Sequence, residues 1–233
     1  MNDKLENITA IGFDADDTLW ENESFYQETE HRFQRLLAHC IKPEKLSRVF
    51  FAAEMRNLKL YGFGAKSFIL SMLETAVRVN PKINAGELNE IFDMGKALID
   101  APLLPLDGAE ETLCALHAKY DLVLVTKGDL LDQARKLEKS GMKKYFSHVE
   151  ILSDKTRDDY KNLLHKLNVR PENFLMVGNS LKSDILPALK TGCACAYIPF
   201  RVTWQHEKMR VPAIRSRRFF KIKSLPEISA ILA

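Results

Sequence analysis

The feature that most constrains this fold is the alternation of short, mostly apolar runs with longer segments of helical periodicity. The apolar runs are ITAIGF (8–13), DLVLVT (121–126), HVEIL (148–152), NFLMVG (173–178) and CACAYIP (193–199). Runs of this length are typical of strands that are buried on both faces of a parallel sheet. Helical patterns separate them, as parallel strands require. The sequence therefore predicts an α/β fold with helices on both faces of the sheet.

One long segment interrupts this alternation. Residues 21–104 contain amphipathic helical patterns and no convincing strand, and Pro102 and Pro105 mark the return to the sheet. The predicted fold class is therefore a Rossmann-like parallel sheet flanked by helices, with an inserted α-helical domain. We expect a core formed by 1–20 and 105–233 and an inserted helical domain at 21–104.

Composition restricts the partners. The formal net charge of +3 is too small to argue for nucleic acid, and no segment approaches the roughly 18 apolar residues of a membrane helix. The first ten residues, MNDKLENITA, lack the apolar stretch of a secretory signal. We therefore expect a cytoplasmic protein without nucleic-acid or membrane partners, and its four cysteines to be buried and reduced. Nothing in the sequence indicates the oligomeric state.

Polar residues follow the predicted strands at the points where the strands end. Ligands of parallel α/β sheets bind beyond the carboxyl ends of the strands, so we expect these side chains to converge. Oxygen donors together with a lysine suit a divalent cation, Mg²⁺, and a phosphate group. The candidate positions are Asp14, Asp16, Thr126, Lys127, Lys155, Asn179 and Asp184.

Four of these strand ends carry recognisable motifs. They read DADDT (14–18), VTKGD (125–129), SDKTRDDY (153–160) and VGNSLKSD (177–184). In this order the motifs resemble those of the haloacid dehalogenase-like hydrolase superfamily, and the inserted helices resemble its subfamily with an α-helical cap. The resemblance covers nearly the whole chain. It implies a phosphatase that uses Mg²⁺ as its cofactor.

The resemblance also implies a role for each matching residue. Asp14 corresponds to the nucleophile that forms an aspartyl-phosphate, and Asp16 to the general acid and base. Thr126 and Lys155 correspond to phosphate ligands, and Lys127 adds a positive charge near the phosphate. The implied Mg²⁺ ligands are Asp14, the backbone carbonyl of Asp16, Asp184 and Asn179.

Some positions depart from the family pattern or leave alternatives open. Asn179 stands where a second acid is common, so we expect weaker Mg²⁺ binding than in relatives with two acids. Lys161 competes with Lys155 for the third-motif role, and Lys155 is favoured because it follows the strand sooner. Asp17 is expected to be a turn residue. Trp20, Tyr61 and Lys66 are candidates for substrate contact.

The predicted function is Mg²⁺-dependent hydrolysis of a small phosphorylated metabolite, such as a nucleotide or sugar phosphate. Asp16 favours this reaction, because an alcohol leaving group needs a proton and a halide does not. A phosphomutase and a 2-haloacid dehalogenase are the alternatives among enzymes. A non-catalytic sensor of a phosphate ligand is the alternative outside enzymes, motivated by Asn179.

Overall fold

The structure is a computed structural model that describes residues 4–210 and 213–233. The chain forms two compact units. The first comprises Met1–Glu23, Leu103–Lys127 and Gln133–Ala233, and the second comprises Ser24–Pro102 and Gly128–Asp132. Residues 128–132, which were expected in the core, belong to the second unit. The domain boundaries at 20/21 and 104/105 stay a prediction.

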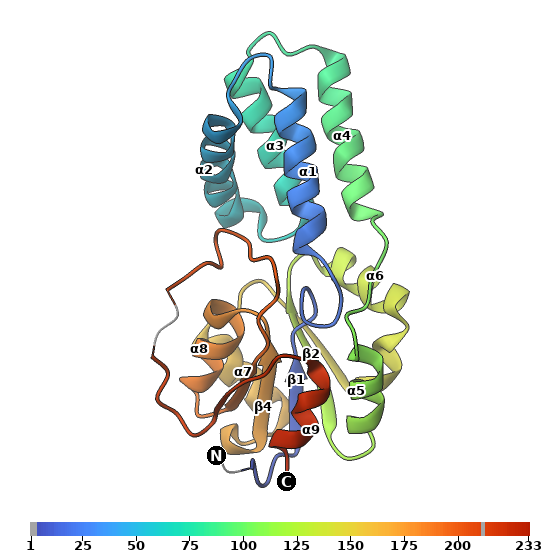
Figure 1. The fold of residues 1–233 in the computed structure, drawn as a ribbon, viewed down its shortest axis with the longest axis vertical. Coiled ribbons are helices and arrows are strands. Elements are labelled where there is room, and N and C mark those ends of the chain that lie inside the picture. The colour runs from blue at the N-terminus through green and yellow to red at the C-terminus, as the bar shows by residue number, and fades with distance from the viewer. Residues whose placement is uncertain (1–3, 211–212) are drawn as a thin grey trace. The chain divides into compact units, whose positions relative to one another are not determined.

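A parallel sheet forms the centre of the first unit (Figure 1). Its six described strands have the order β3-β2-β1-β4-β5-β6, and every neighbouring pair is parallel. This confirms the predicted fold class. The strand order reverses beside β1, so the carboxyl ends of β1, β2 and β4 meet at a topological switch point. The strands are β1 (Ala10–Phe13), β2 (Asp121–Lys127), β3 (His148–Leu152), β4 (Phe174–Gly178), β5 (Ala194–Tyr197) and β6 (Phe219–Lys221).

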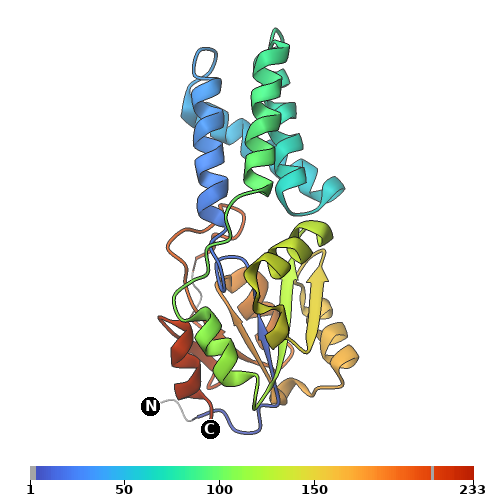
Figure 2. The same ribbon diagram turned by 90° about the vertical axis from the view of Figure 1, so that its right-hand side faces the viewer.

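Helices cover both faces of the sheet. Alternate residues of a strand point to opposite faces, so Ile11 and Phe13 pack in one core and Ala10 in the other. The first core contains side chains of α5 (Ala109–Leu116), α6 (Leu130–Ser140) and α9 (Ile228–Ile231), and Figure 2 shows α9 in red beside α5 in green. The second core contains side chains of α7 (Arg157–Leu167) and α8 (Leu186–Leu189).

The second unit is helical. It contains α1 (Glu23–Leu36), α2 (Pro43–Tyr61), α3 (Ala65–Val79) and α4 (Ala85–Ile99). Its core is aromatic at the centre, where the Phe50 ring makes edge contacts with Phe33 and Phe68. Asn84 begins α4 with a capping box, because its side chain accepts from the Glu87 amide and the Glu87 carboxylate accepts in return.

Two expectations drawn from composition can be compared with the structure. Within the described residues, no helix is long and apolar enough to cross a membrane. All four cysteines are free, and Cys193 and Cys195 are buried as predicted. The prediction was wrong for Cys40 and Cys114, which are exposed. Cys114 lies in α5 and Cys40 in the turn that follows α1, and a cysteine side chain is small enough to be tolerated at either exposed position.

Candidate active site

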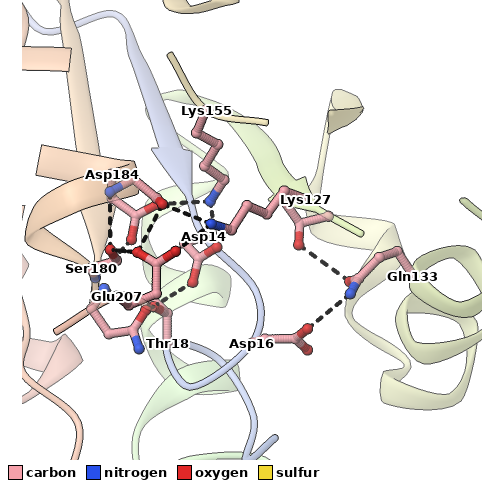
Figure 3. A network of polar contacts seen from close by, with 12 residues as sticks. Asp14, Asp16, Thr18, Lys127, Gln133, Lys155, Ser180, Asp184 and Glu207 are labelled. Carbon is pink, nitrogen blue, oxygen red and sulfur yellow. Dashed lines mark hydrogen bonds and ion pairs between the residues drawn. The ribbon is translucent and has the colours of Figure 1, made fainter. Parts of the chain in front are cut away.

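Three of the predicted strand-end residues meet in one buried cluster (Figure 3). Asp14 directly follows β1, Lys155 lies between β3 and α7, and Asp184 lies in the π-helix Leu181–Ile185 after β4. The Lys155 ammonium donates to Asp14 Oδ1 at 2.5 Å and to Asp184 Oδ1 at 2.7 Å. All three residues are at least nine-tenths buried. The convergence predicted from the strand ends is therefore present in the fold.

The charges in this cluster do not balance. Two carboxylates face one ammonium, and burial removes the water that would solvate them. Burial and the Asp184 carboxylate raise the pKa of Asp14 to about 7, against the lowering effect of Lys155. Burial alone would lower the pKa of Lys155, but the two carboxylates outweigh it and raise that pKa. Lys155 therefore stays charged, and one negative charge of the cluster lacks a partner.

The donors around this unbalanced charge fit a hard divalent cation. Asp14 and Asp184 offer carboxylate oxygens, and the Asn179 amide oxygen lies 3.3 Å from the Thr18 hydroxyl. Within the described residues, no group of three or more His, Cys, Asp or Glu side chains is placed to hold a metal. A Mg²⁺ ion keeps several waters and needs only one or two carboxylates, so this donor set fits it.

The backbone around Asp184 fixes its carboxylate. The Ser180 amide donates to Asp184 Oδ2 at 2.9 Å. The amides of Asp184 and Ile185 both donate to the Ser180 carbonyl, and the second contact is the wide i→i+5 bond of a π-helix. Gly178 leaves the space that Asp184 occupies, since a Cβ on Gly178 would lie 2.3 Å from Asp184 Oδ2.

Gly178→Ala tests how closely Asp184 must be placed. The added methyl group has to displace the Asp184 carboxylate, and a misplacement of about 1 Å in an active site can cost about 10²-fold in rate. We expect kcat for phosphate release to fall by about that factor and the half-saturating Mg²⁺ concentration to rise. Circular dichroism and the melting temperature check that the variant folds. An unchanged kcat in the folded variant would contradict this account of Asp184.

Thr18 belongs to the site, although no role was predicted for it. Its hydroxyl lies 2.9 Å from Asp14 Oδ2 and accepts from the Asn179 backbone amide at 3.1 Å. The side chain is completely buried. Thr18 is the last residue of the DADDT motif. Its position four residues after the nucleophile candidate was the signal that the sequence offered.

Asp16 lies in a different environment from Asp14. Figure 3 shows its carboxylate pointing to Gln133, which donates to Oδ2 at 2.8 Å. Lys136 donates to both oxygens, at 3.0 and 3.1 Å. Gln133 also accepts from the hydroxyl of Thr126 at 3.2 Å, which ties the second motif to Asp16. Gln133 and Lys136 carried no sequence signal, because polar residues on a helix are usually solvated.

The structure argues against the predicted contact of Trp20 with substrate. Trp20 is 1% exposed and lies in the first core. Its indole N–H donates to Asp16 Oδ1 at 2.8 Å. The indole therefore orients Asp16 instead of facing a ligand. The Trp20 ring can be buried because its one polar atom, Nε1, donates a hydrogen bond to a neighbouring carboxylate.

Asp17 is the turn residue that was expected. Its φ of 61° lies in the left-handed region, which aspartate tolerates better than most residues. Its carboxylate accepts from the backbone amides of Asn22 and Glu23 at the start of α1. Burial and the nearby Asp16 raise the pKa of Asp17 to about 7, against these two hydrogen bonds. Asp17 therefore fixes the turn through which the chain leaves the motif and enters α1.

Lys127 is paired within the protein. Its ammonium donates to Glu207 Oε1 at 2.5 Å and to Ser183 Oγ at 2.8 Å. Glu207 also accepts from Ser180 Oγ at 2.5 Å. Burial opposes ionisation of Glu207, but Lys127 and the serines outweigh it and lower the pKa of Glu207 to about 2. Glu207 could not be predicted from the sequence, because the segment after β5 has no periodic pattern. The phosphate-binding role of Lys127 stays a prediction.

A cavity of about 380 Å³ borders this ion pair. Its wall holds five cationic side chains and two carboxylates, and two of the cations, Lys127 and Lys155, are paired with carboxylates of the site. The charged side chains are those of Lys127, Lys155, Arg157, Lys182, Lys190, Asp154 and Glu207.

The remaining candidates lie elsewhere. Lys161 is half exposed and pairs with Asp158, whereas Lys155 lies in the buried cluster; the third-motif role of Lys155 stays a prediction. Tyr61 and Lys66 belong to the second unit. Tyr61 is 57% exposed, and Lys66 contacts Asp129 at 2.9 Å. Their contact with substrate stays a prediction.

Comparison with known proteins gives a consistent result. A family model described as haloacid dehalogenase-like hydrolase matches residues 8–192. A 5-amino-6-(5-phospho-D-ribitylamino)uracil phosphatase of Escherichia coli is 26% identical over 83% of this chain and 84% of its own length. A glyceraldehyde 3-phosphate phosphatase of Methanothermobacter thermautotrophicus is 29% identical over 84% of this chain and 88% of its own length.

Solved structures agree with this fold. A haloacid dehalogenase-like family hydrolase of Xanthomonas campestris superposes with a TM-score of 0.87 at 33% identity, covering 96% of this chain and 90% of its own. An L-2-haloacid dehalogenase of Xanthobacter autotrophicus gives a TM-score of 0.67 at 17% identity, covering 96% of this chain and 98% of its own. The second likeness shows a shared fold alone.

Proposed function

Because this chain belongs to the haloacid dehalogenase-like hydrolase family, we propose that it is a Mg²⁺-dependent phosphomonoester hydrolase with Asp14 as its nucleophile. The substrate is a small phosphorylated metabolite, such as a nucleotide or sugar phosphate. The phosphatase names of curated relatives support this class of substrate. Residues 21–104 form the helical cap in this proposal, and a cytoplasmic location stays a prediction.

The observation that carries the proposal is the separation of two carboxylates only two residues apart. Asp14 is bound by Lys155 and Thr18, whereas Asp16 is bound by Trp20, Gln133 and Lys136. Two carboxylates in different environments can take different roles in one reaction. A nucleophile beside an acid–base residue is the combination that hydrolysis of a phosphate ester through a covalent intermediate requires.

The reaction follows from these positions. An oxygen of Asp14 attacks the phosphorus, and the bond from phosphorus to the alcohol oxygen breaks with the electron pair on that oxygen. Asp16 gives this oxygen its proton. A water molecule then attacks the phosphorus of the aspartyl-phosphate and gives a proton to Asp16, which frees Asp14. Lys155 and the hydroxyl of Thr126 hold the phosphoryl oxygens, since such transfers depend mainly on positioning and neutralisation of charge.

Mg²⁺ would be held by Asp14, Asp184, the Asn179 amide oxygen and the backbone carbonyl of Asp16. When bound, it would neutralise charge on the phosphoryl group and on Asp14. The unbalanced negative charge of the Asp14–Lys155–Asp184 cluster supports this assignment.

Asp16 separates this proposal from a 2-haloacid dehalogenase. A halide leaves without a proton, so a dehalogenase gains nothing from four hydrogen bonds that hold an acid beside the nucleophile.

Phosphate release from a panel of phosphate monoesters, with Mg²⁺ and with chelator, tests the proposal directly. We expect Mg²⁺-dependent release and no chloride from 2-haloacids. Chloride release would contradict the role of Asp16, and ligand binding without turnover of any ester would support a sensor.

A phosphomutase shares the first half of this reaction. It returns the phosphoryl group to a second hydroxyl of a sugar phosphate, so the product is an isomer. Incubation with a hexose 1-phosphate, followed by separate assays for inorganic phosphate and hexose 6-phosphate, distinguishes the two enzymes. We expect inorganic phosphate.

Asn179→Asp tests the predicted weakness of the metal site. A carboxylate adds a negative charge to the ligands of a cation, and ligand charge sets affinity for hard divalent ions. We expect the half-saturating Mg²⁺ concentration to fall by about tenfold. Asn168→Asp, at the end of α7, is the matched control and should leave it unchanged. An unchanged or higher value in Asn179→Asp would contradict the assignment.

A further inference from the structure

The carboxylate of Asp16 is held by more donors than its neighbours in the motif. Oδ1 accepts from Trp20 Nε1 at 2.8 Å and from Lys136 Nζ at 3.0 Å. Oδ2 accepts from Gln133 Nε2 at 2.8 Å and from Lys136 Nζ at 3.1 Å. A carboxylate has about four acceptor positions. Protein donors fill all four, so they determine both the position and the plane of this group.

These donors come from rigid parts of the first unit. Gln133 and Lys136 are three residues apart on α6 and therefore share a face of the helix. Leu137 of the same helix lies in the first core, and Gln133 is 3% exposed. Trp20 is equally fixed by burial in that core. The carboxylate is thus held from two sides by elements that pack against the sheet.

Lys136 differs from the other two donors in having a charge and rotatable hydrogens. Its ammonium also donates to Asn22 Oδ1 at 2.7 Å. The ammonium thus contacts both oxygens of Asp16 and the Asn22 amide oxygen together, while Gln133 and Trp20 fix the orientation of the carboxylate.

We propose that Lys136 is a positioning residue that holds Asp16 for proton transfer and stabilises the charge formed there. This inference rests on the proposed function. As the bond from phosphorus to the leaving oxygen breaks, the proton of Asp16 moves to that oxygen and a negative charge forms on the Asp16 carboxylate. An ammonium 3.0 Å away stabilises that charge where it forms. In this proposal Lys136 acts through Asp16 and not on the phosphoryl group itself.

The test compares leaving groups, because only a poor one needs the proton. The substrates are phenyl phosphate and p-nitrophenyl phosphate, which have the same charge and similar shapes. Proton transfer contributes typically about 10²–10⁴-fold, so Lys136→Met should lower kcat for phenyl phosphate by about 10²-fold and for p-nitrophenyl phosphate by only about threefold. Lys136→Arg should recover much of the difference, because it restores the cation.

Arg135→Met is the matched control. Arg135 is the neighbouring cation on α6 and is exposed, so its loss should leave both rates unchanged. Equal losses on the two substrates in Lys136→Met would overturn the proposal and leave the phosphatase assignment standing. Turnover that survives in Asp14→Asn would instead count against the phosphatase mechanism itself.

A second readout does not depend on turnover. Trp20 is one of two tryptophans, so its indole N–H resonance can be assigned with a Trp20→Phe variant. Release of Asp16 in Lys136→Met should shift this resonance and speed its exchange with solvent, whereas Arg135→Met should change neither. An unchanged Trp20 resonance in Lys136→Met would show that Lys136 does not hold Asp16, whatever the enzyme's reaction.

Discussion

Lys155→Met should destabilise the protein and remove nearly all of its activity. Lys155 is 3% exposed and its ammonium is the shared partner of Asp14 and Asp184. Without it, two buried carboxylates face each other. Removal of one partner from a buried ion pair costs about 3–5 kcal/mol. We expect the free energy of unfolding at pH 8, measured in chelator, to fall by about that amount.

The pH dependence of this loss gives a sharper check. Loss of the cation removes the group that lowers the pKa of Asp14, so that pKa rises further above its unfolded value. The folded variant then binds protons more tightly than the unfolded chain, so its stability should recover as the pH falls from 8 toward 5. Lys161→Met, on the exposed side of α7, is the matched control and should change neither stability nor its pH dependence.

A double variant separates stability from catalysis. Lys155→Met combined with Asp184→Asn leaves only one carboxylate in the cluster, so most of the lost stability should return. Activity should not return, because both the phosphate ligand and the proposed metal ligand are absent. A double variant as unstable as Lys155→Met alone would show that electrostatic repulsion is not the cause of the loss.

Asp14→Asn should abolish phosphate release without unfolding the protein. An amide of the same shape cannot attack phosphorus, and loss of a nucleophile in a catalytic unit costs on the order of 10⁴-fold or more in kcat. Ionised Asp14 is destabilising above its unfolded pKa, because burial and Asp184 raise its folded pKa to about 7. The melting temperature of the metal-free variant at pH 8 should therefore equal or exceed that of the parent.

Measured single-turnover rates with p-nitrophenyl phosphate provide the comparison. Asp17→Asn is the matched control, since Asp17 lies in the same motif but binds the start of α1. It should retain most of the activity. Residual turnover in Asp14→Asn at a tenth of the parent rate would rule out Asp14 as the nucleophile.

The fold could be predicted largely from the sequence because buried parallel strands have a strong signal. ITAIGF, DLVLVT and NFLMVG are mostly apolar, and polar residues lie at or directly after their ends, which indicated both the strands and the edge at which the site lies. The resemblance to a known family then supplied the roles of the residues at that edge. Asp14, Lys155 and Asp184 meet as this reasoning predicted.

The partners of these residues were harder to predict. Gln133 and Lys136 are polar residues on a helix, and nothing local distinguishes them from solvated ones. Glu207 lies in a segment without periodicity, and its pairing with Lys127 depends on the tertiary path of the chain after β5. Trp20 lies in the first core and donates to Asp16, which was not predicted because sequence does not show whether an aromatic residue after a strand turns into the core or away from it.

The most direct test of the account is chemical trapping of the intermediate. The enzyme is mixed with excess phosphate ester and Mg²⁺, quenched in acid within one turnover, digested and analysed by mass spectrometry. We predict one phosphoryl group on the peptide that contains Asp14, absent in Asp14→Asn and formed at least as fast as steady-state turnover. Full turnover without any phosphorylated Asp14 peptide would contradict the account, because water would then attack the substrate directly.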